Sequence, residues 1–357
     1  MANVTKKTTD LTPAQRSANF NLQTRQYIQS LGTMTFGQGQ TISQIMPKSR
    51  FAQKLTLLVS GTFTCTHATK TTFVKSQFDK YNILKQIRLN YNSGFNPYQI
   101  SGSKLYLHNL ITQGRNKFLD SDVFATNVLQ NVVAVGGAIN TIKFALDCPL
   151  SINERDTIGL INLQNLESSL TLEIDCDNVA TVMTDTDITV SAVNITITPV
   201  LTTFSVPALP DAVPDYSILK LVNEDARQII GNGENRFILQ TGLTYRRIMF
   251  YITSDGVTPI ANANLTKIQL AFNQADTPYS VSSDYLAYKN KLEYQGSLPV
   301  GCYCIDFADS GQVNYAGARD YVDTESLTQF ELVLTFSGLA GNNNKIYIIP
   351  EKLAKLN

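Results

Sequence analysis

The sequence predicts a mainly β protein in which two similar domains follow each other along the chain. Three observations support this prediction. Only 16% of the 357 residues are charged, so the polar surface comes mostly from Thr, Asn, Gln and Ser, which suit strands and turns better than exposed helices. Many segments alternate apolar and polar residues. A sequence motif around residue 97 recurs around residue 278, which indicates an internal repeat.

The first 50 residues form a basic arm. They contain six Lys and Arg residues and one Asp, a net charge of +5, so the remainder of this neutral chain carries −5. Within the arm, Thr12, Pro13 and Gln15 fit an N-cap, a first helical position and a capping box. They predict a helix over about 12–30. Its apolar residues form no clean stripe, so we expect it to lie on something outside its own domain.

The two predicted domains are jelly roll 1 at 51–200 and jelly roll 2 at 213–357. Prolines cluster between about 200 and 215, where they can neither continue a sheet nor start a long helix. Each half fits a two-sheet sandwich or a jelly roll, and long connections within each half favour the jelly roll. The alternating apolar positions that predict strands include Leu55, Leu57, Val59, Leu170, Leu172, Ile174, Val193, Ile195, Ile197, Ile248, Phe250, Ile252, Phe330, Leu332, Leu334, Phe336, Ile346 and Ile348.

The repeat joins the two halves. At an offset of 181, which is 278 minus 97, residues 87–114 align with 268–295 without a gap. Each copy is interpreted as a strand, an Asn-Gly-Pro turn that ends it, and a short helix that Ser103 or Ser283 can cap. A spacing as long as a domain predicts duplication of that domain. The identical pairs are Ile87 and Ile268, Leu89 and Leu270, Asn92 and Asn273, Pro97 and Pro278, Tyr98 and Tyr279, Ser101 and Ser282, Leu105 and Leu286, and Asn109 and Asn290.

The titratable residues offer little material for catalysis, so we expect no enzymatic activity and no cofactor. His67 and His108 are the only histidines, and a structural role is expected for each. No G-x-S-x-G elbow occurs. Five cysteines without a secretory signal predict reduced, buried thiols, and Cys302 and Cys304 are expected to share one face of a strand.

One acidic cluster is a weak candidate for a metal site. Asp175 and Asp177 form one D-x-D pair, and Asp185 and Asp187 form a second pair across a short loop. Their oxygens could bind Ca²⁺, and an enzyme that uses such a metal is one alternative. The spacing is not that of an EF-hand, so solvated loop carboxylates are the competing interpretation.

The longest apolar run falls far short of the ~20 residues of a spanning helix, and no apolar stretch follows the N-terminal lysines. The protein is therefore expected to be made and left in a cytoplasm. The 16 tyrosines keep a second function open, a two-domain β-sandwich that binds or processes carbohydrate by stacking rings on sugars. The absence of Trp lowers the expectation of sugar binding.

Several short motifs resemble one family. LTPAQ at 11–15 and NLQTRQ at 21–26 are similar to the start of the major capsid protein of tectiviruses, tailless bacteriophages with a membrane inside an icosahedral shell. The repeated corner and the P-x-G-x-Y motif at Pro299, Gly301 and Tyr303 also look similar to that protein. The resemblance implies two tandem eight-stranded jelly rolls, a double jelly roll, with short helices and an N-terminal helical arm. It also implies homotrimers that form pseudo-hexagonal capsomers.

The resemblance further implies partners and a location. The arm lies beneath the shell in this family, so Lys6, Lys7, Arg16 and Arg25 would contact the internal viral membrane or neighbouring capsomers. Vertex and minor capsid proteins are the other expected partners, and no direct sequence-specific binding of nucleic acid is expected. The protein would assemble in the host cytoplasm and act as a structural component of the virion shell.

Overall fold

The fold is mainly β, as the composition predicts. The computed structural model contains three α-helices in the part of the chain that it describes, α1 (Pro13–Gln23), α2 (Gly102–Gln113) and α5 (Ser283–Glu293). The short 3-10 helices are η1 (Asp79–Ile83), η2 (Val179–Val182) and η4 (Asn262–Asn264). The described residues are 12–92, 94–113, 129–153, 156–165, 167–209, 212–213, 216–274, 276–308 and 321–355.

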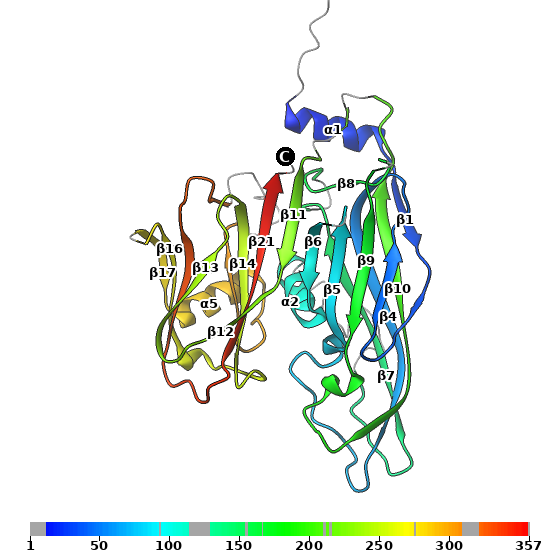
Figure 1. Ribbon diagram of the computed structural model, residues 1–357, viewed down its shortest axis with the longest axis vertical. Coiled ribbons are helices and arrows are strands. Elements are labelled where there is room, and N and C mark those ends of the chain that lie inside the picture. The colour runs from blue at the N-terminus through cyan, green and yellow to red at the C-terminus, as the bar shows by residue number, and fades with distance from the viewer. Residues whose placement is uncertain are drawn as a thin grey trace, which may run out of the picture.

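Roll 1, which runs from β1 to β10, is a sandwich of two antiparallel sheets (Figure 1). One sheet has the order β1-β10-β4-β7, with β2 beside β10 and β8 beside β4, and the other has the order β3-β9-β5-β6. The strands are β1 (Gln26–Ser30), β2 (Met34–Thr35), β3 (Thr41–Ile45), β4 (Phe51–Thr66), β5 (Leu84–Tyr91), β6 (Phe95–Ile100), β7 (Ala138–Pro149), β8 (Ile161–Asn162), β9 (Leu170–Cys176) and β10 (Thr189–Phe204).

Roll 2, which runs from β11 to β21, repeats this arrangement beside roll 1 (Figure 1). The order β21-β14-β18 corresponds to β10-β4-β7, β13-β20-β16-β17 corresponds to β3-β9-β5-β6, and β11 pairs with β21 as β1 pairs with β10. The chain is therefore a double jelly roll. The strands are β11 (Ile218–Asn223), β12 (Asp225–Gln228), β13 (Gly233–Leu239), β14 (Thr244–Ser254), β15 (Thr258–Pro259), β16 (Leu265–Phe272), β17 (Asp276–Val281), β18 (Cys302–Asp306), β19 (Val322–Asp323), β20 (Phe330–Phe336) and β21 (Lys345–Lys355).

The sequence repeat at an offset of 181 is also a repeat of strand register. Ile87 lies opposite Ile100 in the β5–β6 pair, and the residues 181 positions later, Ile268 and Val281, lie opposite each other in the β16–β17 pair. Both hairpins turn through an asparagine with positive φ, 51° at Asn92 and 49° at Asn273, a conformation that Asn tolerates better than most residues. The duplicated motif is thus one unit of structure built twice.

The prediction that the proline belongs to the turn that ends the strand is wrong. Pro97 and Pro278 lie inside β6 and β17, at the irregularity where two residues face one on the neighbouring strand. A β-bulge leaves one residue without a ladder partner, so a proline can occupy it without losing a hydrogen bond. The helix cap is also shifted by one residue, since Ser282 caps α5 by accepting from the Tyr285 amide at 3.2 Å.

The basic arm is shorter than predicted. The capping box of Thr12 and Gln15 is present, but α1 ends at Gln23, not near residue 30. Residues 26–30 instead form β1, because the edge of β10 offers them a hydrogen-bonded ladder along five residues. β2 and β3 also pair with roll 1 strands, so roll 1 begins well before residue 51.

The helix packs on its own domain, contrary to expectation. Phe20 is fully buried against Phe51 and Phe204, with ring centroids 5.8 and 5.4 Å away. Phe20 thus docks α1 across one end of roll 1 (Figure 1), in a small apolar cluster that also contains Leu160. Between the rolls, β10 continues to residue 204 and β11 begins at residue 218, which brackets the predicted proline-rich boundary. Within the described ranges, no helix is long and apolar enough to span a membrane.

Candidate functional site at the seam between the rolls

An extended set of polar contacts lies at the seam, where α2, η1 and β6 of roll 1 meet β11, β14, β18 and β21 of roll 2. β6 and β11 pair in parallel, with Tyr98 opposite Val222 and Gln99 opposite Asn223, so one continuous sheet runs through both rolls. Glu224 extends the junction, because its amide donates to the Gln99 carbonyl and its carboxylate accepts from the Ser101 amide. The rolls are joined by backbone hydrogen bonds as well as by side chains.

The seam buries both faces of the roll 2 sheet. β14 and β18 have buried residues along almost their whole lengths, which is unusual for a strand that covers a single core. Alternate residues such as Phe250 and Tyr303 point into the core of roll 2. The residues between them, including Tyr251, Cys302 and Cys304, belong to the apolar cluster of roll 1. Separation of the rolls would expose this shared core to water.

A buried lysine sits in an aromatic cage at the seam. The Lys104 ammonium on α2 lies 4.3 Å from the ring centroid of Tyr347 and 5.0 Å from that of Tyr251, both on roll 2. Phe78 adds a third ring at 5.6 Å. Burial lowers the pKa of Lys104, and the rings replace part of its lost hydration by cation–π attraction.

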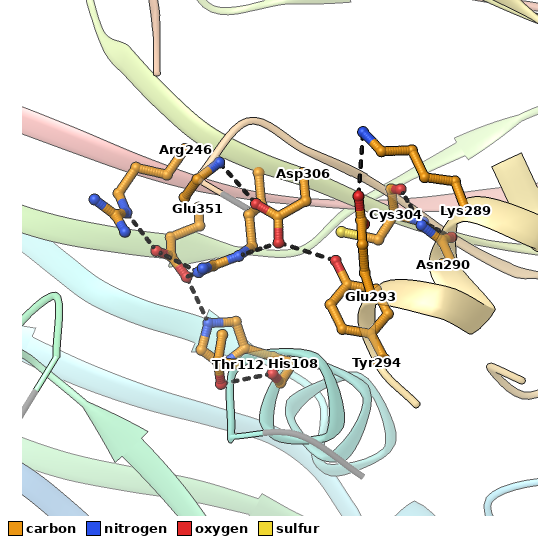
Figure 2. A network of polar contacts seen from close by, with 12 residues as sticks. His108, Thr112, Arg246, Lys289, Asn290, Glu293, Tyr294, Cys304, Asp306 and Glu351 are labelled. Carbon is orange, nitrogen blue, oxygen red and sulfur yellow. Dashed lines mark hydrogen bonds and ion pairs between the residues drawn. The ribbon is translucent and has the colours of Figure 1, made fainter. Parts of the chain in front are cut away.

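A buried ionic network forms the centre of the seam (Figure 2). The Glu351 carboxylate is inaccessible to solvent and accepts from Arg246 Nε at 3.1 Å and Arg247 Nη1 at 2.9 Å. Arg247 Nε donates to Asp306 at 2.9 Å, and the Tyr294 hydroxyl donates to the same carboxylate oxygen. Two consecutive arginines reach one carboxylate because a register shift after Tyr245 turns both toward it.

The electrostatics of the network keep Glu351 ionised. Burial by itself would raise the pKa of Glu351, but Arg247, Lys220 and His108 outweigh it and hold this pKa well below its usual range. Lys220 is also fully buried, and its ammonium donates to the Ser151 carbonyl at 3.1 Å. Burial lowers the pKa of Lys220 to about 8. A buried network of this kind can add little net stability over apolar residues of the same shape, whereas removal of one partner is costly.

His108 connects α2 to this network as a neutral donor. Its Nε2 lies 3.1 Å from Glu351 Oε2, and its buried Nδ1 has no hydrogen-bond partner among the described residues. Burial lowers the pKa of His108 despite the carboxylate beside it. The proton of the neutral imidazole therefore sits on Nε2, which makes the contact a charge-assisted hydrogen bond.

The lowered pKa of His108 makes the seam sensitive to acid. As pH falls from about 7 to 5, the histidine of the unfolded chain binds a proton before the folded one does, so stability falls by at most about 1.4 kcal/mol per pH unit from this residue. His108→Gln keeps a donor to Glu351 and should flatten this decline. Urea unfolding at pH 7, 6 and 5 measures it, and equally steep declines in both proteins would contradict the assignment.

Two asparagines hold equivalent helices to equivalent strands. Asn109 of α2 donates to the Asp147 carbonyl at 2.7 Å and accepts from the Asp147 amide at 2.8 Å. Asn290 of α5, 181 residues later, makes the same pair of bonds to Cys304, at 2.7 and 2.9 Å. Both side chains are buried. They explain one of the eight identical pairs in the repeat as a clamp between a helix and a strand.

The prediction of reduced, buried thiols is confirmed. Cys65, Cys148, Cys176, Cys302 and Cys304 are all buried and unpaired with one another. Burial raises the pKa of each thiol, to about 11 for Cys65, so none ionises near neutral pH.

The native protein should therefore be inert to a thiol reagent such as DTNB at pH 8. All five thiols should react after unfolding in urea, because unfolding restores both access and an ordinary pKa. Absorbance of the released thiolate counts the reacted groups. Rapid reaction of even one thiol in the native state would contradict the described packing.

Three of the four candidate calcium ligands are engaged by cations. Lys70 contacts Asp185 and Asp187 at 2.7 Å each, and its hydrogen bonds lower the pKa of both carboxyls. Asp175 accepts from Arg88 at 3.0 Å, whereas Asp177 caps the following backbone amide. In the described ranges, no group of three or more His, Cys, Asp or Glu residues is placed to hold a metal ion. This arrangement favours the interpretation of ordinary loop carboxylates.

Two of the candidate membrane-contacting residues, Arg16 and Arg25, lie at one end of roll 1. Arg25 is exposed and Arg16 is half-buried, in and just after α1. Lys6 and Lys7 lie outside the described residues. Arg50 belongs to the same end, where its guanidinium covers the Tyr27 ring at 3.8 Å.

Sequence reasoning missed the ionic network. His108 and Glu351 are 243 residues apart, and Arg246, Arg247 and Asp306 come from two further strands. The network could have been suspected from charged residues inside otherwise apolar strands, as in YRRIMFY around Arg246 and IIPEKL around Glu351. Charged residues are rarely buried unless they are paired, so such positions point to a partner elsewhere in the fold.

Comparisons with known proteins agree with this architecture. No protein-family model and no curated protein matches the sequence. Among solved structures, the major capsid protein of Sulfolobus Turreted Icosahedral Virus (STIV) superposes with a TM-score of 0.68, covering 93% of this chain and 97% of that chain at 17% identity. VP54 of PBCV-1, fitted into a reconstruction of the virophage Sputnik, gives 0.65, with 94% and 95% coverage at 10% identity.

The major capsid protein P2 of bacteriophage PM2 also matches along its whole length. Its TM-score is 0.56, and the match covers 93% of this chain and 98% of that chain at 12% identity. Identities this low establish the fold and nothing finer. The chain has the double jelly-roll fold of these viral major capsid proteins.

Proposed function

We propose that this protein is the major capsid protein of an icosahedral virion and forms homotrimeric, pseudo-hexagonal capsomers. The observation that carries the proposal is the extent of the match, which includes both rolls and 97% of the STIV protein. Two equivalent rolls in one chain allow three chains to present six similar units. The proposal requires no chemistry at a site, and the comparisons do not favour a carbohydrate-binding or glycan-processing role.

The oligomeric state tests this proposal directly. Sedimentation velocity of the purified full chain in physiological buffer is expected to give a trimer, and negative-stain images should show particles with six-lobed outlines. Obligate interfaces of this kind bury 2,000 Å² or more, so the trimer should persist at low micromolar concentration. A protein that remains monomeric at every accessible concentration would count against a capsomer role.

We further propose that the shell encloses a membrane, as in tectiviruses, and that Lys6, Lys7, Arg16 and Arg25 face its anionic lipids. The sequence resemblance supports this, together with the gathering of Arg16, Arg25 and Arg50 at one end of roll 1. Each basic group near an anionic surface contributes about 1 kcal/mol. Vertex and minor capsid proteins would complete the shell, which would assemble in the host cytoplasm.

Vesicle sedimentation tests the membrane contact. The protein should bind phosphatidylglycerol-containing vesicles at low salt, bind phosphatidylcholine vesicles less, and lose binding as salt rises. Lys6→Glu with Lys7→Glu should weaken this binding by at least about tenfold. The matched control reverses two exposed lysines elsewhere, Lys85 and Lys267. Equal loss in both double variants would indicate a general charge effect and not a contact made by the arm.

A further inference from the structure

The helix α5 exposes the face that its counterpart α2 buries. Three residues of α5, spaced three and four apart on one side of the helix, are 53–61% exposed. The residues 181 positions earlier on α2 are 0–8% exposed, and α2 is the helix packed against the roll 2 sheet. The pairs are Lys104 and Tyr285, Leu107 and Tyr288, and Ile111 and Leu292.

The strands beside these helices differ in the same way. β6 pairs with β11 across the seam, whereas its counterpart β17 lies at the end of its sheet with mostly exposed residues. β11 is buried along its centre, whereas its counterpart β1 is exposed at all five positions, including Ile28 at 71%. The roll 1 side of the seam, α2 and β6, therefore has uncovered counterparts in α5 and β17. On the roll 2 side of the seam, β11 has an uncovered counterpart in β1.

The internal duplication also indicates which sheet would cover α5. Asn109 clamps Asp147 as Asn290 clamps Cys304, so these two strand positions correspond. In roll 1, the strand pairing runs from β7 to Thr56 and Leu58 on β4 and then to Val200 and Thr198 on β10. In roll 2, the same pairing runs from β18 to Met249 and Tyr251 on β14 and then to Ile349 and Tyr347 on β21. The roll 1 counterpart of the sheet that covers α2 is thus the outer face of β10-β4-β7.

That outer face has a composition suited to the α5 stripe. Thr56, Thr198 and Val200 are half-buried and Leu58 is 38% exposed, so the centre of the face is partly apolar. The Asp147 carboxylate beside Thr56 is buried and paired with Lys54. Tyrosine presents an apolar ring with a hydroxyl that threonine can bond, a combination frequent at protein interfaces.

We infer that a second copy of this chain covers α5 and β17 with its own roll 1. The outer face of β10-β4-β7 packs on Tyr285, Tyr288 and Leu292, and β1 adds to the free edge of β17 as β11 adds to β6. Such a contact uses two different patches, so it is heterologous and repeats around a ring. It rests on the proposed capsomer and specifies the surfaces through which three chains close.

A disulfide across the predicted strand junction tests the contact. Asn223 faces Gln99 within the chain, and the corresponding positions are Gln29 on one copy and Ser280 on the next. Paired strand residues lie within the Cα separation of about 4.4–6.8 Å that disulfides require. The double variant Gln29→Cys with Ser280→Cys should give dimer and trimer bands on a non-reducing gel, absent from either single variant. The pair Gln29→Cys with Ile238→Cys, on another face of roll 2, should stay monomeric on that gel.

Substitution on α5 supplies a second measurement. Tyr288→Asp with Leu292→Asp should weaken association by at least about 100-fold in sedimentation velocity, with the circular dichroism spectrum unchanged. Val257→Asp with Ile238→Asp, also exposed apolar positions, should leave association intact. A wild-type monomer would overturn the capsomer proposal itself. A wild-type trimer without the cross-link, and insensitive to the α5 substitutions, would overturn only this assignment of surfaces.

Discussion

Replacing Glu351 by alanine is expected to lower the free energy of unfolding by about 3–5 kcal/mol. The substitution removes the acceptor of Arg246, Arg247 and His108 while leaving both guanidinium groups buried at the seam. Arg247 keeps Asp306 as a counter-charge, but Arg246 loses the ion pair with Glu351 and stays buried, so water must enter the seam or the packing around Arg246 must loosen. Urea unfolding of the full chain at pH 7, followed by circular dichroism, measures the loss.

The matched control is Glu325→Ala. Glu325 forms an exposed ion pair with Lys355 at 3.5 Å, so its removal should cost less than about 1 kcal/mol. Comparable small losses in the two variants would contradict the central role assigned to the buried network. Glu351→Gln, which keeps the shape and one acceptor oxygen, should fall between wild type and Glu351→Ala.

Replacing either clamp asparagine by alanine is expected to cost about 2–4 kcal/mol. Asn109→Ala leaves both the amide and the carbonyl of Asp147 without their partners, and Asn290→Ala does the same to Cys304. Each unsatisfied buried group costs about 1–3 kcal/mol. Because the two clamps are equivalent, the two losses should be similar in urea unfolding.

Asn343→Ala provides the control for this pair. Asn343 is exposed, and its side chain reaches the Asp255 carbonyl at 3.5 Å, so we expect a change within about 0.5 kcal/mol. A large loss for Asn109 with none for Asn290 would mean that the duplicated clamp kept its geometry in roll 2 but lost its energetic role.

The duplication of the domain could be predicted because it depends on local sequence patterns. Alternating apolar residues specify strands, and identical residues at a fixed offset specify that the same corner is built twice. The match of register between β5–β6 and β16–β17 follows from this, since turn, bulge and cap residues recur together. The placement of Pro97 and Pro278 was missed because a proline ends a regular strand but is accommodated in a bulge, and only the paired strand creates the bulge.

The N-terminal helix illustrates a second limit of local pattern. A capping box marks where α1 begins, but nothing after Gln23 marks an end, because residues 26–30 have no strong preference of their own. Their structure is decided by pairing with the edge of β10, whose partner residues lie 170 to 178 positions later in the chain. Pairing with β10 therefore prevents the helix that begins at Pro13 from continuing through residues 26–30.

The sequence by itself determined the β class, the doubling of the domain, the buried thiols and the scarcity of catalytic residues, since each depends on residue type and near neighbours. Only the tertiary structure decided that α2 is covered and α5 is not, and that Glu351 meets His108 and two arginines. Burial of a second face, and the pairing of charges 243 residues apart, depend on which surfaces meet after the strands have formed. No periodicity within a single strand carries that information, because the same alternation fits a strand covered on one side or on both.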